Sequence, residues 1–354
     1  MNTSKKYHLI VYGCQMNVAD GERLAAVLEK NGCKKTSDIN KADLILVVMC
    51  SVRQPAVDRV LGLAPKFKKL RKGNPGLKTV LTGCILKKDR KVFSGIFDCV
   101  LDIKNLAAWP FLRKRGTADF SNIAPKYSSK SSVFVPISNG CNNFCSYCVV
   151  PFTRGPLVCR NHEEILKEIR CLAAKRVKEI WLLGQNVNDY QSPADASVGF
   201  AELFKMAENI PGNFKILFLS PNPKNFSDKL IKALSLSKKF GRRLNLPVQS
   251  GDDKILKKMN RPYTVEKYFV LVEKIRKAIP EINLSTDVIV GFPGETKKQF
   301  ENTAKLFKKI KFNIAYINKY SPRFGTAAFK MKNDVPWTEK KRREKILMDI
   351  INDQ

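Results

Sequence analysis

Short apolar runs alternate with amphipathic stretches along almost the whole chain, and this alternation limits the possible folds more than any other feature. Near the N-terminus, helical patterns at residues 20–32 and 54–75 separate the apolar runs. The run at 42–49 is almost entirely apolar, as expected of a strand buried on both faces. Strands that alternate with helices predict a parallel sheet with helical crossovers. The strands predicted here span residues 8–13, 42–49, 77–83 and 97–103.

A second series of strands and helices follows. Roughly six strand–helix repeats predict a partial β/α barrel, and a basic amphipathic helix at 337–353 ends the chain. The predicted strands are 133–138, 179–184, 214–220, 242–248, 282–291 and 312–320. The predicted helices between them are 163–176, 199–209, 225–236, 265–278 and 297–310.

The two series are separated by residues 116–132, which are polar and contain serine and proline, so we predict a linker there. A chain of 354 residues is long enough for two domains. We therefore predict an α/β protein with an N-terminal parallel-sheet, flavodoxin-like domain at 1–125 and a barrel domain at 130–354.

The chain is strongly basic, with 64 lysines and arginines against 32 aspartates and glutamates and a net charge of +32. A surface of this charge attracts polyanions, which favours nucleic-acid binding. The alternative is a solvated lysine-rich surface that only aids solubility. The basic residues gather in several runs: 66–72, 87–91, 113–115, 238–243 and 340–345.

The chain contains ten cysteines and only two histidines.

No apolar stretch approaches the roughly 20 residues that span a bilayer, and the N-terminal run leads straight into a motif rather than a signal cleavage site. We therefore expect a cytoplasmic protein with no membrane partner. In a reducing compartment, cysteines are more often used for metal or redox chemistry than for disulfides.

Three cysteines lie close together in GCNNFCSYC, directly after the strand predicted at 133–138. Three thiolates on one loop can bind three irons of a 4Fe–4S cluster and leave the fourth iron open, because no further cysteine follows at ferredoxin spacing. The alternatives are a metal-free loop or a zinc site completed by a distant residue. The three residues are Cys141, Cys145 and Cys148.

Cys14, Cys50 and Cys84 each follow a predicted strand directly and are 34 to 36 residues apart. Carboxyl ends of parallel strands share one edge of a sheet, so these thiols should converge there. We predict a second three-thiolate 4Fe–4S site. The alternative is three buried structural cysteines. The remaining cysteines lack the pattern and are interpreted as structural: Cys33, Cys99, Cys159 and Cys171.

These cysteines and the motifs around them resemble the radical S-adenosylmethionine (SAM) methylthiotransferase family over essentially the whole chain. The matching N-terminal motifs are YGCQMN (12–17), MCSVR (49–53) and TGC (82–84). Those of the second part are GCNNFCSYCVVPFTRG (140–155), LLGQNVN (182–188), LPVQSG (246–251) and DVIVGFPGE (287–295).

Within this family the motifs are most similar to the MiaB branch, which converts N6-isopentenyladenosine at tRNA position 37, next to the anticodon, to its 2-methylthio form. Sister branches modify threonylcarbamoyladenosine in tRNA or an aspartate of a ribosomal protein. A different alternative is a non-catalytic iron–sulfur electron-transfer protein. The chain departs from the family in ending before the usual C-terminal TRAM domain, and PLVCRN follows FTRG.

The resemblance implies two 4Fe–4S clusters and SAM as cofactors. It also implies a tRNA anticodon stem-loop as substrate and an electron donor such as flavodoxin or ferredoxin; we expect a monomer. One SAM would supply a methyl group to a sulfide on the first cluster, and a second would give the radical that attacks C2 of the adenine. No side chain beyond the cluster ligands is expected to be catalytic. We expect Arg154 to bind the SAM carboxylate or an RNA phosphate. The other predicted SAM contacts are Tyr147, Gln185, Asn186, Pro247, Gln249, Ser250 and Gly291.

Overall fold

The computed structural model describes residues 5–52, 54–105, 109–110, 112, 120 and 123–353. It divides into two compact units. The first comprises Met1–Pro136 with Phe152–Gly155, and the second comprises Ile137–Pro151 with Pro156–Gln354. The linker predicted at 116–132 lies partly outside the described residues, so our domain boundaries of 1–125 and 130–354 stay a prediction.

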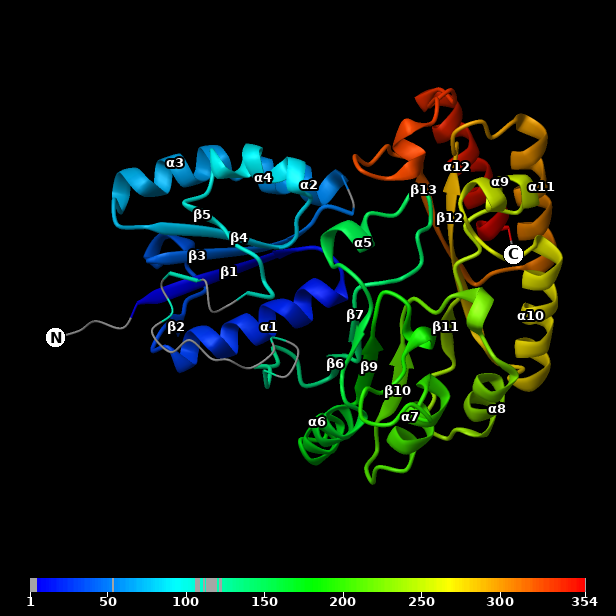
Figure 1. The fold of residues 1–354 in the computed structure, drawn as a ribbon, viewed down its shortest axis with the longest axis horizontal. Coiled ribbons are helices and arrows are strands. Elements are labelled where there is room, and N and C mark those ends of the chain that lie inside the picture. The colour runs from blue at the N-terminus through cyan, green and yellow to red at the C-terminus, as the bar shows by residue number, and fades with distance from the viewer. Residues whose placement is uncertain are drawn as a thin grey trace. The chain divides into compact units, whose positions relative to one another are not determined.

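A parallel five-stranded sheet forms the first unit, in the order β2-β1-β3-β4-β5 (Figure 1). The predicted parallel sheet is therefore confirmed. Its strands are β1 (Lys6–Tyr12), β2 (Lys34–Lys35), β3 (Leu44–Cys50), β4 (Lys78–Cys84) and β5 (Cys99–Val100). Its helices are α1 (Gln15–Lys30), η1 (Ile39–Lys41), α2 (Gln54–Leu61), α3 (Ala64–Gly73) and α4 (Lys87–Ser94), and β6 (Ser132–Pro136) contacts α1.

Apolar side chains cover both faces of this sheet. Leu24 and Leu28 of α1 pack with Leu46 and Val48 on one face. Helices α2, α3 and α4 cover the other face, where their apolar residues pack with β3 (Figure 1). Every residue of β3 is buried, as its apolar sequence requires.

Two predicted elements of this unit are wrong in extent. The single helix expected at 54–75 is two helices, α2 and α3, because Gly62 lies between them and Pro65 occupies the first turn of α3. Proline is tolerated in a first turn but disrupts a helix interior. The strand expected at 97–103 pairs only at Cys99–Val100.

The second unit repeats parallel strands and helices. Strands β9 (Glu179–Leu183) and β10 (Lys215–Phe218) pair in parallel, and β11 (Arg243–Asn245), β12 (Asn283–Val290) and β13 (Ile314–Lys319) form a parallel sheet. These strands match the predicted β/α barrel series, and the fold class is confirmed. The remaining strands are β7 (Ser138–Asn139) and β8 (Val158–Cys159).

Helices follow most of these strands in the chain (Figure 1). The predicted helix at 297–310 coincides with α11, whose N-cap Thr296 and third residue Gln299 form a capping box. The short helix α9 was not predicted. The helices are α5 (Val150–Thr153), α6 (His162–Ala174), η4 (Val187–Asp189), α7 (Phe200–Glu208), η5 (Pro223–Asn225), α8 (Asp228–Leu236), α9 (Asp253–Lys258), α10 (Val265–Ala278), α11 (Lys297–Ile310), η6 (Ala327–Lys330) and α12 (Trp337–Asn352).

None of the described helices combines the length and the apolar character that crossing a membrane requires.

Candidate functional site: two cysteine trios

Cys14, Cys50 and Cys84 meet at the carboxyl edge of the first unit's sheet. Cys50 is the last residue of β3 and Cys84 the last of β4, and the two are directly paired in the parallel register. Cys14 follows β1 and is the N-cap of α1. The Cys50 thiol hydrogen-bonds with both Cys14 and Cys84. The strand ends therefore gather the three sulfurs, as their positions in the sequence indicated.

Asn17 links this trio through its fully buried side chain. Its Oδ1 accepts hydrogen bonds from the backbone N–H of Cys14 at 3.2 Å and from the Cys14 thiol at 3.4 Å. Its Nδ2 donates to the Met49 carbonyl at 3.1 Å and lies 3.6 Å from the Cys84 sulfur. The amide thus fixes the start of α1 against the ends of β3 and β4.

Arg154 supplies a cation to the same trio. Its Nε donates to the Cys84 sulfur at 2.9 Å, and a terminal nitrogen pairs with Asp20 at 2.7 Å. Burial alone would lower the pKa of Arg154, but the negative charges of Asp20 and Cys84 outweigh it and raise this pKa. The guanidinium is therefore engaged within the first unit. Its predicted role with SAM or an RNA phosphate stays a prediction.

Hydrogen bonding among the thiols shifts their pKa values in opposite directions. The hydrogen bond with Cys50 lowers the pKa of Cys14 to about 6, against the opposing effect of burial. The same kind of bond from Cys50 lowers the pKa of Cys84, and the bonds to its two neighbours raise the pKa of Cys50. Thiolates are the form of cysteine that binds metal, and the pKa values of Cys14 and Cys84 are shifted toward this form.

The chemistry of these donors fits an iron–sulfur cluster. Among the described residues, no group of three or more histidine, cysteine, aspartate or glutamate side chains is placed to hold one metal ion. In a cubane cluster each thiolate binds a different iron. Three cysteines with N–H donors directed at sulfur match the ligands and the outer partners that such a cluster takes.

Cys141, Cys145 and Cys148 lie on one loop of the second unit. The Cys148 N–H donates to the Cys145 carbonyl at 3.0 Å in a tight turn. The Cys141 sulfur accepts from the Asn143 N–H at 3.4 Å. Burial raises the pKa of Cys141, and it raises that of Cys148 to about 12. This trio also offers three thiols and no fourth protein ligand on its loop.

Side chains distant in the sequence hold this loop in place. Ser146 donates its hydroxyl to the Lys258 carbonyl at 2.8 Å, and its own carbonyl accepts from Ala328 at 2.7 Å. Arg261 lies 3.5 Å from the Cys145 sulfur. Tyr147 is half-buried and packs against the apolar cluster that contains Met259. No sequence signal pointed to Arg261 or Ser146.

Gln185 and Asn186 follow β9 and approach the loop. Gln185 accepts the Gly140 N–H at 2.5 Å, directly before Cys141. Asn186 is buried, and neither polar atom of its side chain has a hydrogen-bond partner among the described residues. A buried amide without a partner costs about 1–3 kcal/mol, so Asn186 has hydrogen-bonding capacity for a ligand or a water molecule.

The other predicted SAM contacts lie in well-bonded backbone turns. The Pro247 carbonyl accepts from Tyr263, the Gln249 N–H donates to Asp287 at 2.9 Å, and Ser250 is fully buried. The Gly291 N–H donates to Glu295 at 2.6 Å, and the space above its Cα is filled by the Lys340 side chain. These contacts explain the turns structurally, and their role with SAM stays a prediction.

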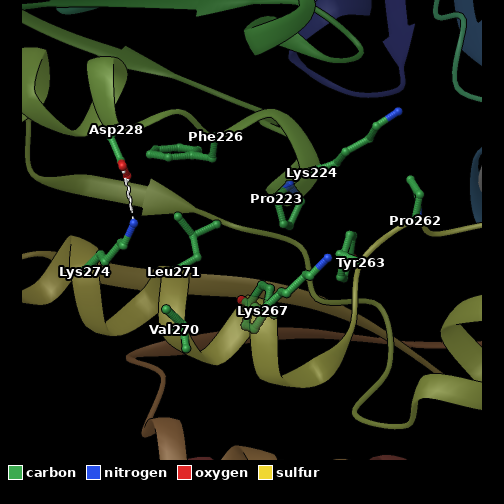
Figure 2. A pocket seen from close by; sticks show the side chains of 11 residues that line it. Pro223, Lys224, Phe226, Asp228, Pro262, Tyr263, Lys267, Val270, Leu271 and Lys274 are labelled. Carbon is green, nitrogen blue, oxygen red and sulfur yellow. Dashed lines mark hydrogen bonds and ion pairs between the residues drawn. The ribbon is translucent and has the colours of Figure 1, made fainter.

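A hollow of about 250 Å³ lies elsewhere in the second unit, between η5, α8 and α10. Figure 2 shows the Lys267 side chain extending toward Tyr263, while Lys274 pairs with Asp228 at 3.1 Å. None of the six cysteines of the two trios lines it.

Known proteins resemble this chain over nearly its full length. The Radical SAM superfamily model matches residues 135–307, and the model of Uncharacterized protein family UPF0004 matches residues 6–101. The tRNA-2-methylthio-N(6)-dimethylallyladenosine synthase of Thermoanaerobacter sp. (strain X514) is 40% identical over 98% of this chain and 78% of its own length. The protein of the same name from Carboxydothermus hydrogenoformans is 38% identical over 98% of this chain and 83% of its own length.

Solved structures support the fold alone. The radical S-adenosylmethionine methyltransferase TsrM from Kitasatospora setae covers 89% of this chain and 73% of its own, with a TM-score of 0.59 and 14% identity. The cobalamin-dependent S-adenosylmethionine radical enzyme OxsB covers 99% of this chain and 56% of its own, with a TM-score of 0.60 and 12% identity.

Proposed function

We propose that this chain, which belongs to the family of radical SAM methylthiotransferases, adds a methylthio group to C2 of N6-isopentenyladenosine next to the anticodon of tRNA. The observation that carries the proposal is that relatives named for this reaction match the chain from end to end at 38–40% identity. The two cysteine trios are the ligand sets that such chemistry needs.

In the proposed enzyme, Cys14, Cys50 and Cys84 hold one 4Fe–4S cluster, and Cys141, Cys145 and Cys148 hold the other. When bound, the clusters and SAM supply the radical and the sulfur. A radical is needed because an adenine C–H bond does not react with acid–base groups. Three ligands leave one iron of each cluster without a protein side chain. The chain's own contribution is to position these groups and to exclude water from them.

Residues of the second unit make the proposed SAM contacts. Asn186 has the strongest claim, since its buried amide is unpaired among the described residues. Gln185 orients the cysteine loop through Gly140. We also propose contacts from Tyr147 and from the turns at Pro247, Gln249, Ser250 and Gly291. The basic runs, which account for much of the +32 charge, would bind phosphates of the anticodon stem-loop.

We also propose a localisation, an oligomeric state, an electron donor and the domain boundaries. The protein acts in the cytoplasm as a monomer, and a flavodoxin or ferredoxin donates electrons. The first domain spans about residues 1–125 and the radical SAM domain residues 130–354.

Nucleoside mass spectrometry tests the function directly. The chain is expressed in a strain whose tRNA carries N6-isopentenyladenosine but no methylthio derivative. We expect the 2-methylthio nucleoside to appear with the native chain and with Cys171→Ser, whose thiol is exposed. It should be absent with Cys14→Ala and with Cys145→Ala. A methylthio group on threonylcarbamoyladenosine or on a ribosomal protein instead would refute the substrate assignment.

A further inference from the structure

Arg154 is held against the first cysteine trio although it follows the second trio in the sequence, six residues after Cys148. Residues Phe152–Gly155 belong to the first unit. The Arg154 side chain is only 8% exposed, and that of its partner Asp20 is 7% exposed. A buried arginine needs specific partners to offset the loss of its hydration, and here these include the Asp20 carboxylate and the Cys84 sulfur.

Different nitrogens of the Arg154 guanidinium bind Asp20 and Cys84. A terminal nitrogen donates to Asp20 at 2.7 Å, whereas Nε donates to the Cys84 sulfur at 2.9 Å. Asp20 lies on α1, whose first turn starts at Cys14, and so the carboxylate is fixed by the helix that carries another thiol of the trio. The Lys104 ammonium binds the Arg154 carbonyl, which anchors the backbone of the same residue.

A hydrogen bond to a ligand sulfur and a nearby buried charge both change the redox properties of an iron–sulfur cluster. An N–H donor withdraws electron density from the sulfur, and a cation stabilises the more negative, reduced state. Asp20 opposes this effect, because its negative charge lies beside the cation. Because the buried site has a low dielectric, the electrostatic effect of each of these charges on the cluster is stronger than it would be in water.

We propose that Arg154 is a positioning residue for the cluster held by Cys14, Cys50 and Cys84, where it orients the Cys84 thiolate and raises the cluster's reduction potential, with Asp20 holding the guanidinium and moderating its charge. The inference rests on the proposed function in one respect, namely that this trio holds a cluster.

The test measures the reduction potential of this cluster alone. In the full-length chain, Cys141, Cys145 and Cys148 are replaced by alanine, the protein is reconstituted anaerobically, and the midpoint is obtained by EPR-monitored redox titration without SAM or tRNA. Arg154→Gln should shift the midpoint to a more negative potential, because a cation and a sulfur donor are lost. Asp20→Asn should shift it in the opposite direction. Arg154→Lys keeps the charge and should stay closer to the native value than Arg154→Gln.

Arg160→Gln is the matched control. Arg160 is also buried and pairs with Glu168 at 2.8 Å, but it lies in the second unit and its removal should leave the midpoint unchanged. A purely structural role for Arg154 predicts loss of iron or of stability without opposite shifts from Arg154→Gln and Asp20→Asn. Unchanged midpoints, or shifts of the same sign, would overturn the inference. Absence of any cluster in the parent protein would overturn the proposed function and this inference together, and iron analysis distinguishes that case.

Discussion

Gly83 offers a sharp test of how the sheet places two of the cluster ligands. It precedes Cys84 and has φ +109°, a conformation that residues with a side chain rarely adopt. It pairs with Met49, the residue before Cys50. A Cβ added at Gly83 would lie 2.3 Å from the Met49 carbonyl oxygen and 2.9 Å from its nitrogen. Both are backbone atoms, so β4 must move away from β3 at the point where the thiols meet.

The cost of Gly83→Ala follows from these contacts. The backbone conformation contributes about 1–3 kcal/mol, and overpacking in a well-packed interior costs about 1–3 kcal/mol more. The sum, on the order of 2–6 kcal/mol, is a large part of the 5–15 kcal/mol that typically stabilises a folded protein. We therefore expect a strong loss of stability and a loss of iron from the first trio.

Urea unfolding of the cluster-free chain under reducing conditions measures the first effect, and iron per chain after anaerobic reconstitution measures the second. Gly73→Ala is the control, since a Cβ there meets nothing within 4 Å. If Gly83→Ala matched this control in both measurements, the close pairing of β3 and β4 at the ligands would be wrong.

Three further predictions follow from other contacts. Asn17→Ala removes a buried amide that bonds to Cys14 and to the Met49 carbonyl, so the free energy of unfolding should fall by about 1–3 kcal/mol, and an unchanged urea midpoint would contradict this. Hydrogen bonds from Arg342 and Arg343 lower the pKa of Glu339 from 4.5 to about 2. The contribution of this carboxylate to the free energy of unfolding is therefore present above about pH 4.5 and is lost as the pH falls toward 2. Glu339→Gln should therefore cost on the order of 1 kcal/mol at pH 7 after solvent screening, and the difference in urea midpoints should shrink at pH 3; an equal difference at both pH values would refute the pairing. Cys171→Ser should leave the iron content unchanged, while Cys145→Ala should remove about four irons per chain; equal iron in the two variants would argue against the second trio.

The convergence of Cys14, Cys50 and Cys84 could be predicted because it depends only on strand order. Each thiol follows an apolar strand, and parallel strands end at one edge, so the geometry follows once the strands are recognised. The pairing of Cys50 with Cys84 in the structure is the direct result. Whether these thiols bind a cluster stays a prediction from their chemistry.

The partners of the trios could not be predicted in the same way. The role of Arg154 with SAM or RNA stays a prediction, but its contact with the first trio was not foreseen, because a sequence shows that a guanidinium is present and not which groups it contacts. Its contact with Cys84 joins residues 70 positions apart. No pattern in the sequence singled out Asn17, and only tertiary packing shows that its amide reaches the end of β3. Gly62 and Pro65 are residues that indicate a break between α2 and α3. The amphipathic pattern continues on both sides of them, and for this reason a single helix was predicted.

The most direct test of the account is an iron and acid-labile sulfide analysis of the anaerobically reconstituted chain. Two independent cubanes predict about eight irons per chain, falling to about four when either Cys14, Cys50 and Cys84 or Cys141, Cys145 and Cys148 are changed to alanine. A native chain that binds only about four irons, all of them lost with the second trio, would contradict the claim that the first unit holds a cluster.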